Sequence, residues 1–263
     1  MARILILSSW VAHGHVGLSA AAPALQALGH SVTQLPTVQL SNHPGWPHVA
    51  GRPVPVDDLA AMVEVLDANG WLGRHDALLT GYLPSPDHVR FAVSLIGRLR
   101  EGAPGLRVVV DPVLGDHPGG LYLDPAAAGA LRDELLPLAS VLTPNLFELE
   151  WLCGAPAGTT EAALASASSL RDRTGAAVLV TSPPLSSGQT GLLALTDAGA
   201  MLYGTPRADA RRVPHGTGDV FSALIAGGLS PGAALGHLQA LVDASLGAPH
   251  LRIGETADSW RAA

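Results

Sequence analysis

The stretch LRVVVD at residues 106–111 decides the fold class of this chain. Its apolar, β-branched residues predict a short buried strand that ends at the carboxylate of Asp111. Strands that read as nearly continuous apolar runs are typical of parallel sheets, which are buried on both faces. We therefore expect this strand to lie inside a sheet with a layer of helices on each side.

Strands and helices alternate on both sides of this stretch. The predicted strands cover Ile4–Ser8, Ser31–Val38, Asp76–Thr80, Leu106–Asp111, Val141–Thr143 and Ala177–Thr181, followed by a hairpin of Gly191–Thr196 and Met201–Thr205. The predicted helices cover Leu18–Leu28, Asp57–Asn69, Ser85–Glu101, Pro125–Leu136, Leu146–Leu152, Glu161–Thr174, Gly218–Gly227 and Ala233–Leu246. Loops are expected at Ser41–Pro55 and Gly115–Tyr122, which are rich in glycine and proline. The pattern predicts an α/β fold with a mostly parallel central sheet, in one domain over residues 1–263.

The composition excludes several classes of function. All 15 basic residues are arginine, so the chain has no lysine for a P-loop or for a Schiff base with pyridoxal phosphate. Any phosphate group would have to be bound by arginine, by backbone N–H groups or by a metal ion. The net charge of −7 and the lack of a basic block argue against nucleic acid as a partner. The apolar runs are too short for a membrane span or a signal peptide, so we expect a cytoplasmic protein.

Small or polar residues stand where the predicted strands end. In open α/β sheets, ligands bind beyond the carboxyl ends of the parallel strands. Each of these residues alone is weak evidence, because a polar residue at a strand end is common. Together they predict a binding site at one edge of the sheet, formed by Ser9, Thr37, Gly81, Asp111, Thr143 and Thr181.

The segment Gly216-Thr217-Gly218-Asp219 carries the strongest chemical signal, because it precedes the apolar helical run Val220–Ile225. Its glycines let the backbone approach a ligand, and N–H groups at a helix start favour anionic oxygens. An aspartate at this place can accept the proton of an attacking hydroxyl group. A structural alternative stays open, in which Thr217 or Asp219 simply caps the helix.

A series of motifs, in order along the chain, resembles the pyridoxal kinases of the ribokinase-like superfamily. These motifs are GHVG at 14–17, TVQLSNH at 37–43, GYLPS at 81–85, DPVLGD at 111–116, TPNLFE at 143–148, VTS at 180–182 and GTGD at 216–219. The resemblance implies a three-layer α/β/α ribokinase-like fold. It also implies ATP-dependent phosphorylation of the 5′-hydroxyl group of pyridoxal, pyridoxine or pyridoxamine, with Mg²⁺ and a possible monovalent cation.

The same resemblance implies roles for individual residues. Asp219 is the expected catalytic base, and the amides of Gly216, Thr217 and Gly218 are the expected anion hole. The vitamer is expected to contact Ser9, Thr37, Tyr82 and Asp219. ATP is expected to contact Asp111, Asp116, Tyr122, Asn145, Glu148, Thr181, Ser182 and Thr217. Mg²⁺ is expected near Asp111, Glu148 and Thr143.

Two other functions stay open at this point. A kinase of the same fold could phosphorylate hydroxymethylpyrimidine, which is also a flat heteroaromatic ring with a CH₂OH arm, although the TVQLSNH segment speaks against it. A noncatalytic protein that holds B6 vitamers is the other alternative, and the retained Asp219 argues against that one. The resemblance further implies a homodimer. His215 departs from the family pattern, which usually has a small apolar residue before GTGD.

Overall fold

The computed structural model describes residues 1–262, which contain a central sheet of nine strands. In spatial order these strands are β11 (Gly199–Pro206), β10 (Gln189–Thr196), β9 (Ala177–Thr181), β8 (Val141–Leu142), β5 (Arg107–Val110), β4 (Ala77–Thr80), β1 (Arg3–Val11), β2 (Ser31–Leu40) and β3 (Gly51–Pro53). The strands from β9 to β2 pair in parallel. Antiparallel strands complete both edges. The predicted mostly parallel sheet is therefore confirmed.

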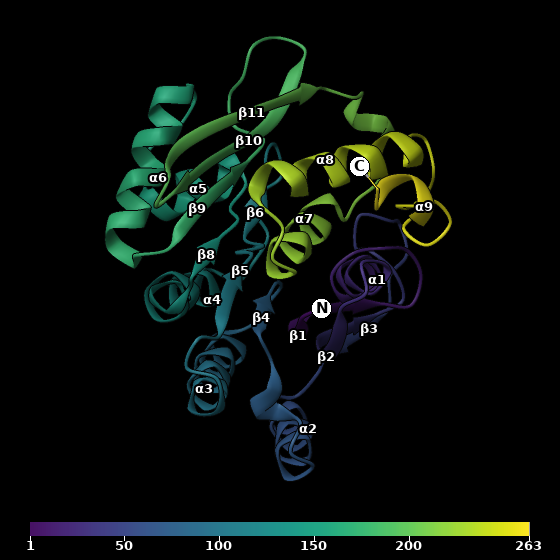
Figure 1. Ribbon diagram of the computed structural model, residues 1–263, viewed down its shortest axis with the longest axis vertical. Coiled ribbons are helices and arrows are strands. Elements are labelled where there is room, and N and C mark those ends of the chain that lie inside the picture. The colour runs from purple at the N-terminus through teal and green to yellow at the C-terminus, as the bar shows by residue number, and fades with distance from the viewer. Residues whose placement is uncertain (263) are drawn as a thin grey trace.

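Helices cover both faces of this sheet (Figure 1). One face packs against α2 (Val56–Ala68), α3 (Pro86–Gly102), α4 (Pro125–Ala130), α5 (Leu146–Cys153) and α6 (Thr160–Thr174). The other face packs against α1 (Leu18–Ala27), α7 (Thr217–Ala226), α8 (Pro231–Ser245) and α9 (Ala257–Trp260). Successive side chains of β5 enter opposite cores, with Val108 and Val110 on the first side and Val109 on the second. This arrangement is the predicted three-layer α/β/α fold.

The first and last parts of the chain share one side of the sheet. Helix α1 lies beside α7, although about 200 residues separate them in the sequence (Figure 1). Both helices are rich in alanine where they meet, so their backbones come close together. This packing brings the GHVG turn before α1 next to the GTGD turn at the start of α7. No helix within residues 1–262 is long and apolar enough to cross a membrane.

Two segments predicted as loops contain short strands. Within Ser41–Pro55, β3 pairs with the end of β2, where a Cβ atom on Gly51 would lie 2.0 Å from the carbonyl oxygen of Gln39. Within Gly115–Tyr122, β6 (Gly115–Asp116) and β7 (Gly120–Leu121) form a small hairpin. Neither segment has the periodic apolar pattern that predicts a strand. These short strands form through backbone pairing, which the sequence pattern does not reveal.

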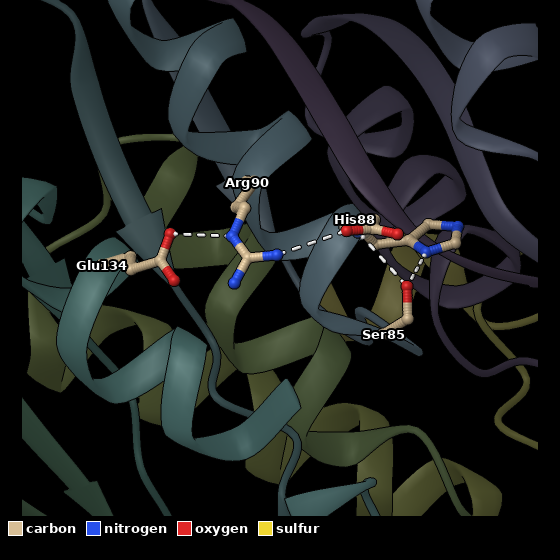
Figure 2. A network of polar contacts seen from close by, with 5 residues as sticks. Ser85, His88, Arg90 and Glu134 are labelled. Carbon is tan, nitrogen blue, oxygen red and sulfur yellow. Dashed lines mark hydrogen bonds and ion pairs between the residues drawn. The ribbon is translucent and has the colours of Figure 1, made fainter. Parts of the chain in front are cut away.

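Helix α3 begins as the sequence predicts, at the serine of the GYLPS motif. The hydroxyl oxygen of Ser85 accepts a hydrogen bond from the backbone N–H of His88 and lies 2.8 Å from its Nδ1 atom (Figure 2). His88 Nε2 bonds the carbonyl oxygen of Val54, which ties the helix start to the segment before α2. Arg90 pairs with Glu134 at 3.4 Å (Figure 2). These contacts fix the Gly81–Ser85 turn at the edge of the sheet.

Candidate active site

A cleft of about 730 Å³ opens at the carboxyl edge of the sheet. The ends of β9, β10 and β11 form one wall, and the start of α7 and one face of α8 form the other. Several predicted ATP and anion-hole residues lie together on its lining: Asp116, Asn145, Thr181, Ser182, Gly216, Thr217 and Gly218. The lining face of α8 is mostly apolar, with Leu235, Leu238 and Val242 at helical spacing. The cleft thus combines an apolar wall with backbone donors.

Helix α7 presents free backbone N–H groups to this cleft. The residue before the helix, Gly216, adopts φ 99°, a left-handed conformation that favours glycine. A Cβ atom at this position would lie 2.0 Å from the carbonyl oxygen of His15, so the GHVG turn also requires a glycine here. No side chain caps the helix start. Gly216 is the N-cap residue, so neither Thr217 nor Asp219 caps the helix from that position. The Asp219 carboxylate accepts its own backbone N–H, and the N–H groups before it stay available for an anion.

Asp219 lies in the first turn of α7 and is partly buried. Burial raises the pKa of Asp219 to about 6, although backbone N–H groups of Gly17 and of Asp219 itself oppose the shift. Its side chain lines a cavity of about 10 Å³ together with Asp111, Ser222 and Gly17. A carboxylate with a pKa this close to neutrality is suited to accepting a proton during a reaction.

Asp111 is buried at the end of β5 beneath the start of α7. The hydroxyl group of Ser222, one turn after Asp219, donates to Asp111 Oδ2 at 2.9 Å. The Thr143 hydroxyl lies 2.8 Å from the Ser222 hydroxyl, so β5, β8 and α7 are joined by one chain of hydrogen bonds. Burial, and then the charges of Glu148 and Asp219, hold the pKa of Asp111 well above its usual range. A cation nearby would favour the ionised form of this group.

Glu148 is buried and has a structural role as well as a predicted one. Its Oε2 atom accepts the N–H of Asn145 at 2.8 Å, while the Asn145 side chain accepts the N–H of Glu148, so the pair forms a capping box on α5. Its Oε1 atom accepts the N–H of Leu114 at 2.9 Å. Burial raises the pKa of Glu148 to about 7, against the lowering effect of these N–H groups. The TPNLFE motif thus also holds the loop after Asp111 in place.

These carboxylates fit a magnesium ion that is held mainly by phosphates and water. Within residues 1–262, no three His, Cys, Asp or Glu side chains gather closely enough to hold a metal ion alone. The charge of Glu148 nevertheless helps to raise the pKa of Asp111, and an added cation would favour the ionised form of Asp111. Magnesium keeps several waters and commonly binds through one or two carboxylates plus substrate phosphates. The donor set is therefore consistent with the predicted ion.

Two residues beside the cleft adopt left-handed backbone conformations without being glycine. Val113 in the DPVLGD motif has φ 47°, and Ser182 at the end of the VTS motif has φ 53°. Such conformations are disfavoured for residues with a Cβ atom and are concentrated at functional sites. The backbone N–H of Ser182 donates to the carbonyl oxygen of Gly191 on β10. This bond fixes Ser182 on the cleft lining. The resemblance predicts that Ser182 contacts ATP.

The predicted vitamer contacts Ser9 and Thr37 lie at a β-bulge between β1 and β2. Ser8 pairs with Pro36 and Trp10 pairs with Gln39, so two residues of β2 stand opposite Ser9. Ser9 packs against Gly17, where a Cβ atom would lie 2.3 Å from the serine hydroxyl oxygen. The bulge places Ser9 beside Gly17 of the GHVG turn, and the backbone N–H of Gly17 bonds Asp219.

Thr37 is fully buried and reaches Tyr82 through its backbone. The threonine hydroxyl group donates to the carbonyl oxygen of Tyr82 at 2.6 Å. The N–H of Tyr82 in turn donates to the hydroxyl oxygen of Ser8 at 3.2 Å. Thr37 and Ser8 therefore fix the position of Tyr82. A direct contact between Thr37 and a ring substrate stays a prediction.

Tyr122, a predicted ATP contact, is 54% exposed on the loop after β7. Burial of its hydroxyl group, and then the charges of Glu148 and Asp111, raise the pKa of Tyr122. Tyr122 does not line the cleft in the described part of the chain, so its contact with ATP stays a prediction.

Histidine side chains gather at the mouth of the site. His43 stacks on His215 with ring centroids 4.2 Å apart and an angle of 20° between the rings. This contact joins the loop after β2 to the residue before the anion-hole glycine. His15 and His250 meet edge to face at 4.8 Å, and His15 Nδ1 bonds the carbonyl oxygen of Leu251. These contacts identify the histidines as packing residues of the surrounding loops.

Comparison with known proteins identifies the family. The family model described as phosphomethylpyrimidine kinase matches residues 57–245. A pyridoxine/pyridoxal/pyridoxamine kinase of Bordetella avium is 40% identical over 238 residues, which are 88% of this chain and 79% of that protein. A pyridoxal kinase PdxY of Corynebacterium diphtheriae is 35% identical over 228 residues, which are 86% of this chain and 80% of that protein. This chain belongs to the pyridoxal kinase family.

Solved pyridoxal kinases have the same architecture as this family member. The pyridoxal kinase of Leishmania donovani in complex with ADP and pyridoxine superposes with a TM-score of 0.90 at 29% identity, and the match covers 98% of this chain and 95% of that one. A putative phosphomethylpyrimidine kinase of Bacteroides thetaiotaomicron superposes with a TM-score of 0.85 at 27% identity, covering 97% and 92%. The ribokinase-like fold implied by the sequence motifs is therefore confirmed.

The structure adds residues that sequence reasoning missed in this pyridoxal kinase family member. Ser222 and Ser8 hold Asp111 and Tyr82 in place, and Arg207 lies on the cleft lining. One signal for Ser222 was visible, because a serine three residues after Asp219 interrupts an otherwise apolar helix. Ser8 and Arg207 carry no such signal, since a strand-end serine and a surface arginine are ordinary residues.

Proposed function

We propose that this chain is an ATP-dependent kinase that phosphorylates the 5′-hydroxyl group of pyridoxal, pyridoxine and pyridoxamine. One observation carries the proposal: Asp219, with its pKa raised by burial to about 6, lies at an uncapped helix start that opens on a 730 Å³ cleft. The base and the anion-binding N–H groups are thus adjacent. This is the arrangement that phosphoryl transfer to a hydroxyl group requires.

In this proposal Asp219 accepts the proton of the vitamer's CH₂OH group as its oxygen attacks the γ-phosphorus of ATP. The N–H groups of Gly216, Thr217 and Gly218 stabilise the charge on the transferred phosphoryl oxygens. ADP leaves along the cleft lined by Asn145, Thr181 and Ser182. Ser9 and Tyr82 hold the ring. Thr37 fixes Tyr82 through its hydrogen bond to the tyrosine carbonyl oxygen, and the resemblance adds a contact between Thr37 and the ring.

Magnesium belongs to the same proposal. Asp111, Glu148 and Thr143 are the residues that would hold it, mostly through water, beside the donor phosphates. When bound, the ion would offset phosphate charge that a chain without lysine cannot offset with that side chain. The homodimer, the monovalent cation and the cytoplasmic location implied by the resemblance stay predictions.

The solved relatives support the choice of substrates. The Leishmania donovani pyridoxal kinase was solved with ADP and pyridoxine, and also with ADP and pyridoxamine, at TM-scores of 0.90 and 0.89. The Bordetella avium relative is named for all three vitamers. The TVQLSNH segment also supports the proposal, because Thr37 bonds the carbonyl oxygen of Tyr82 and His43 stacks on His215 beside the GTGD turn.

Hydroxymethylpyrimidine is the second candidate substrate. The family model that matches residues 57–245 is described as phosphomethylpyrimidine kinase, and one similar solved structure has that putative assignment. Both kinds of substrate are flat rings with a hydroxymethyl arm, so Asp219 and the anion hole would serve either. The ring pocket therefore has to discriminate between them.

A competition assay with MgATP tests the proposal. Equal concentrations of pyridoxal and hydroxymethylpyrimidine are supplied, and both phosphorylated products are quantified over time. We expect pyridoxal 5′-phosphate to be the main product of the competition. Pyridoxine and pyridoxamine should also be phosphorylated when each is supplied alone. A dominant pyrimidine product would favour the second candidate. Calorimetric binding of vitamers without any ADP release would instead support a noncatalytic binding protein.

A further inference from the structure

The cleft at the start of α7 would have to bind a negatively charged nucleotide although several carboxylates lie beside it. The negative charges of four carboxylates act together beside the cleft, since all four raise the pKa of Tyr122: Asp111, Asp116, Glu148 and Asp219. Their mutual repulsion is visible in the raised pKa of Asp111, which burial and the charges of Glu148 and Asp219 produce. A donor with a polyphosphate chain brings further negative charge. With no lysine in the chain, a positively charged side chain that binds this polyphosphate has to be arginine or histidine.

Arg207 is the arginine on the lining of the cleft, among the residues that the structure describes. It follows directly after β11, which runs antiparallel to β10 and therefore in the same direction as β9. Its chain thus leaves the sheet at the same carboxyl edge as Thr181 and Ser182. The N–H of Arg207 donates to the carbonyl oxygen of Gly188 at 2.9 Å, which anchors the residue to the start of β10.

Three other basic side chains near the cleft already have partners. His117, on the same lining, lies 2.9 Å from Glu150 Oε2, and His215 stacks on His43. Arg211, four residues further along, pairs with Asp209 at 3.0 Å. Within residues 1–262, the guanidinium group of Arg207 has no ion pair with a carboxylate and is exposed. Its hydrogen-bond donors are therefore available to a ligand in the cleft.

We propose that Arg207 binds the polyphosphate of the nucleotide donor and so positions it for transfer. The guanidinium group presents several N–H donors in a planar fork that matches phosphate oxygens. Arg207 and Ser182 lie on the same wall of the cleft, opposite the N–H groups of α7, so the polyphosphate would be held from both sides. This inference rests on the proposed function, since it assumes a nucleotide donor in this cleft.

Matched charge removals provide the test. The apparent KM for ATP is measured for the wild-type chain, Arg207→Gln and Arg211→Gln, with pyridoxal saturating. We expect about a 10-fold rise in KM for ATP in Arg207→Gln and less than about a 2-fold rise in Arg211→Gln. Arg207→Lys should recover part of the loss, because it keeps the charge and loses the fork. Equal changes in the two glutamine variants would overturn the proposal, because they would reflect only the net charge.

Inhibition by ADP and by adenosine separates the polyphosphate from the rest of the nucleotide. In Arg207→Gln, the inhibition constant of ADP should rise together with the KM for ATP, while that of adenosine should stay unchanged. A matching loss for adenosine would assign Arg207 to the base or ribose and would overturn the proposal. If the wild-type chain released no ADP with any vitamer, the proposed function would fail. Calorimetric titration of the same variants with MgADP would then still decide the role of Arg207.

Discussion

The side of the site proposed to hold ATP, the donor side, is built differently from the side proposed to hold the vitamer, the acceptor side. On the donor side, Asp111, Thr143 and Ser222 form one buried hydrogen-bonded chain, and Glu148 holds the backbone on both sides of it. On the acceptor side, the bulge at Ser9 lies where β1 and β2 pair, and the loop that follows β2 carries His43, which stacks on His215. Phosphoryl transfer needs fixed charges, which regular elements supply. The predicted ring contacts Ser9 and Thr37 lie on strands, but the loops beside them can change while the fold stays the same.

Asp219 stands between the two sides, so its replacement should give the largest effect. We expect Asp219→Asn to lower kcat by about a thousandfold, because the isosteric amide cannot accept a proton at neutral pH. The measurement is steady-state ADP release with pyridoxal and MgATP. Asp87→Asn, which removes an exposed charge on α3, is the control and should keep wild-type activity. A full rate in Asp219→Asn would assign the base elsewhere.

The same residue should make stability depend on pH. Because the folded-state pKa of Asp219 is raised to about 6, the native state holds its proton more tightly than the unfolded chain does. Its favourable contribution is therefore fully present below about pH 4 and is lost as the pH rises through 6. At pH 8, Asp219→Asn should be more stable than the wild type by about 2 kcal/mol, or roughly 5 °C in Tm.

The difference between variant and wild type is the quantity to measure. Burial lowers the pKa of His43 and of His75, so these two groups stabilise the folded state as the pH rises. In a pH series on the wild type by itself, their effect would partly hide that of Asp219. Both chains share these histidines, so the difference in Tm cancels them. It should shrink from pH 8 towards pH 5. A difference that stayed constant with pH would mean that Asp219 has an ordinary pKa in the folded state.

The two sides also differ in how well the sequence predicts them. The strand ending at Asp111 and the capping box of Asn145 and Glu148 are local patterns, so their elements were predicted correctly. The bond between Ser222 and Asp111 joins residues 111 positions apart, and no local pattern announces such a partner. Strand β3 was missed for a related reason, because it forms only where Gly51 lets its backbone approach β2.

The family resemblance alone does not establish which group the side chain of Thr37 contacts. The resemblance assigns it to the ring, whereas the structure buries it and directs its hydroxyl group to the carbonyl oxygen of Tyr82. A motif preserves residue identities but does not say which atom each side chain reaches. The acceptor side therefore needs experiments that separate holding a neighbour from contacting the substrate.

A pair of threonine replacements gives the smallest effect and the sharpest comparison of the two sides. Thr37→Val keeps the shape of the side chain and removes its bond to Tyr82, so we expect about a 3-fold rise in the KM for pyridoxal with the KM for ATP unchanged. Thr143→Val removes the bond to Ser222 on the donor side and should raise the KM for ATP instead. A rise well above 10-fold for pyridoxal in Thr37→Val would indicate a direct contact with the ring, since one neutral hydrogen bond to a neighbour contributes only about 1 kcal/mol. If both variants changed the two KM values alike, the donor and acceptor sides would not be separable, because the buried hydrogen bonds would then couple them into one unit.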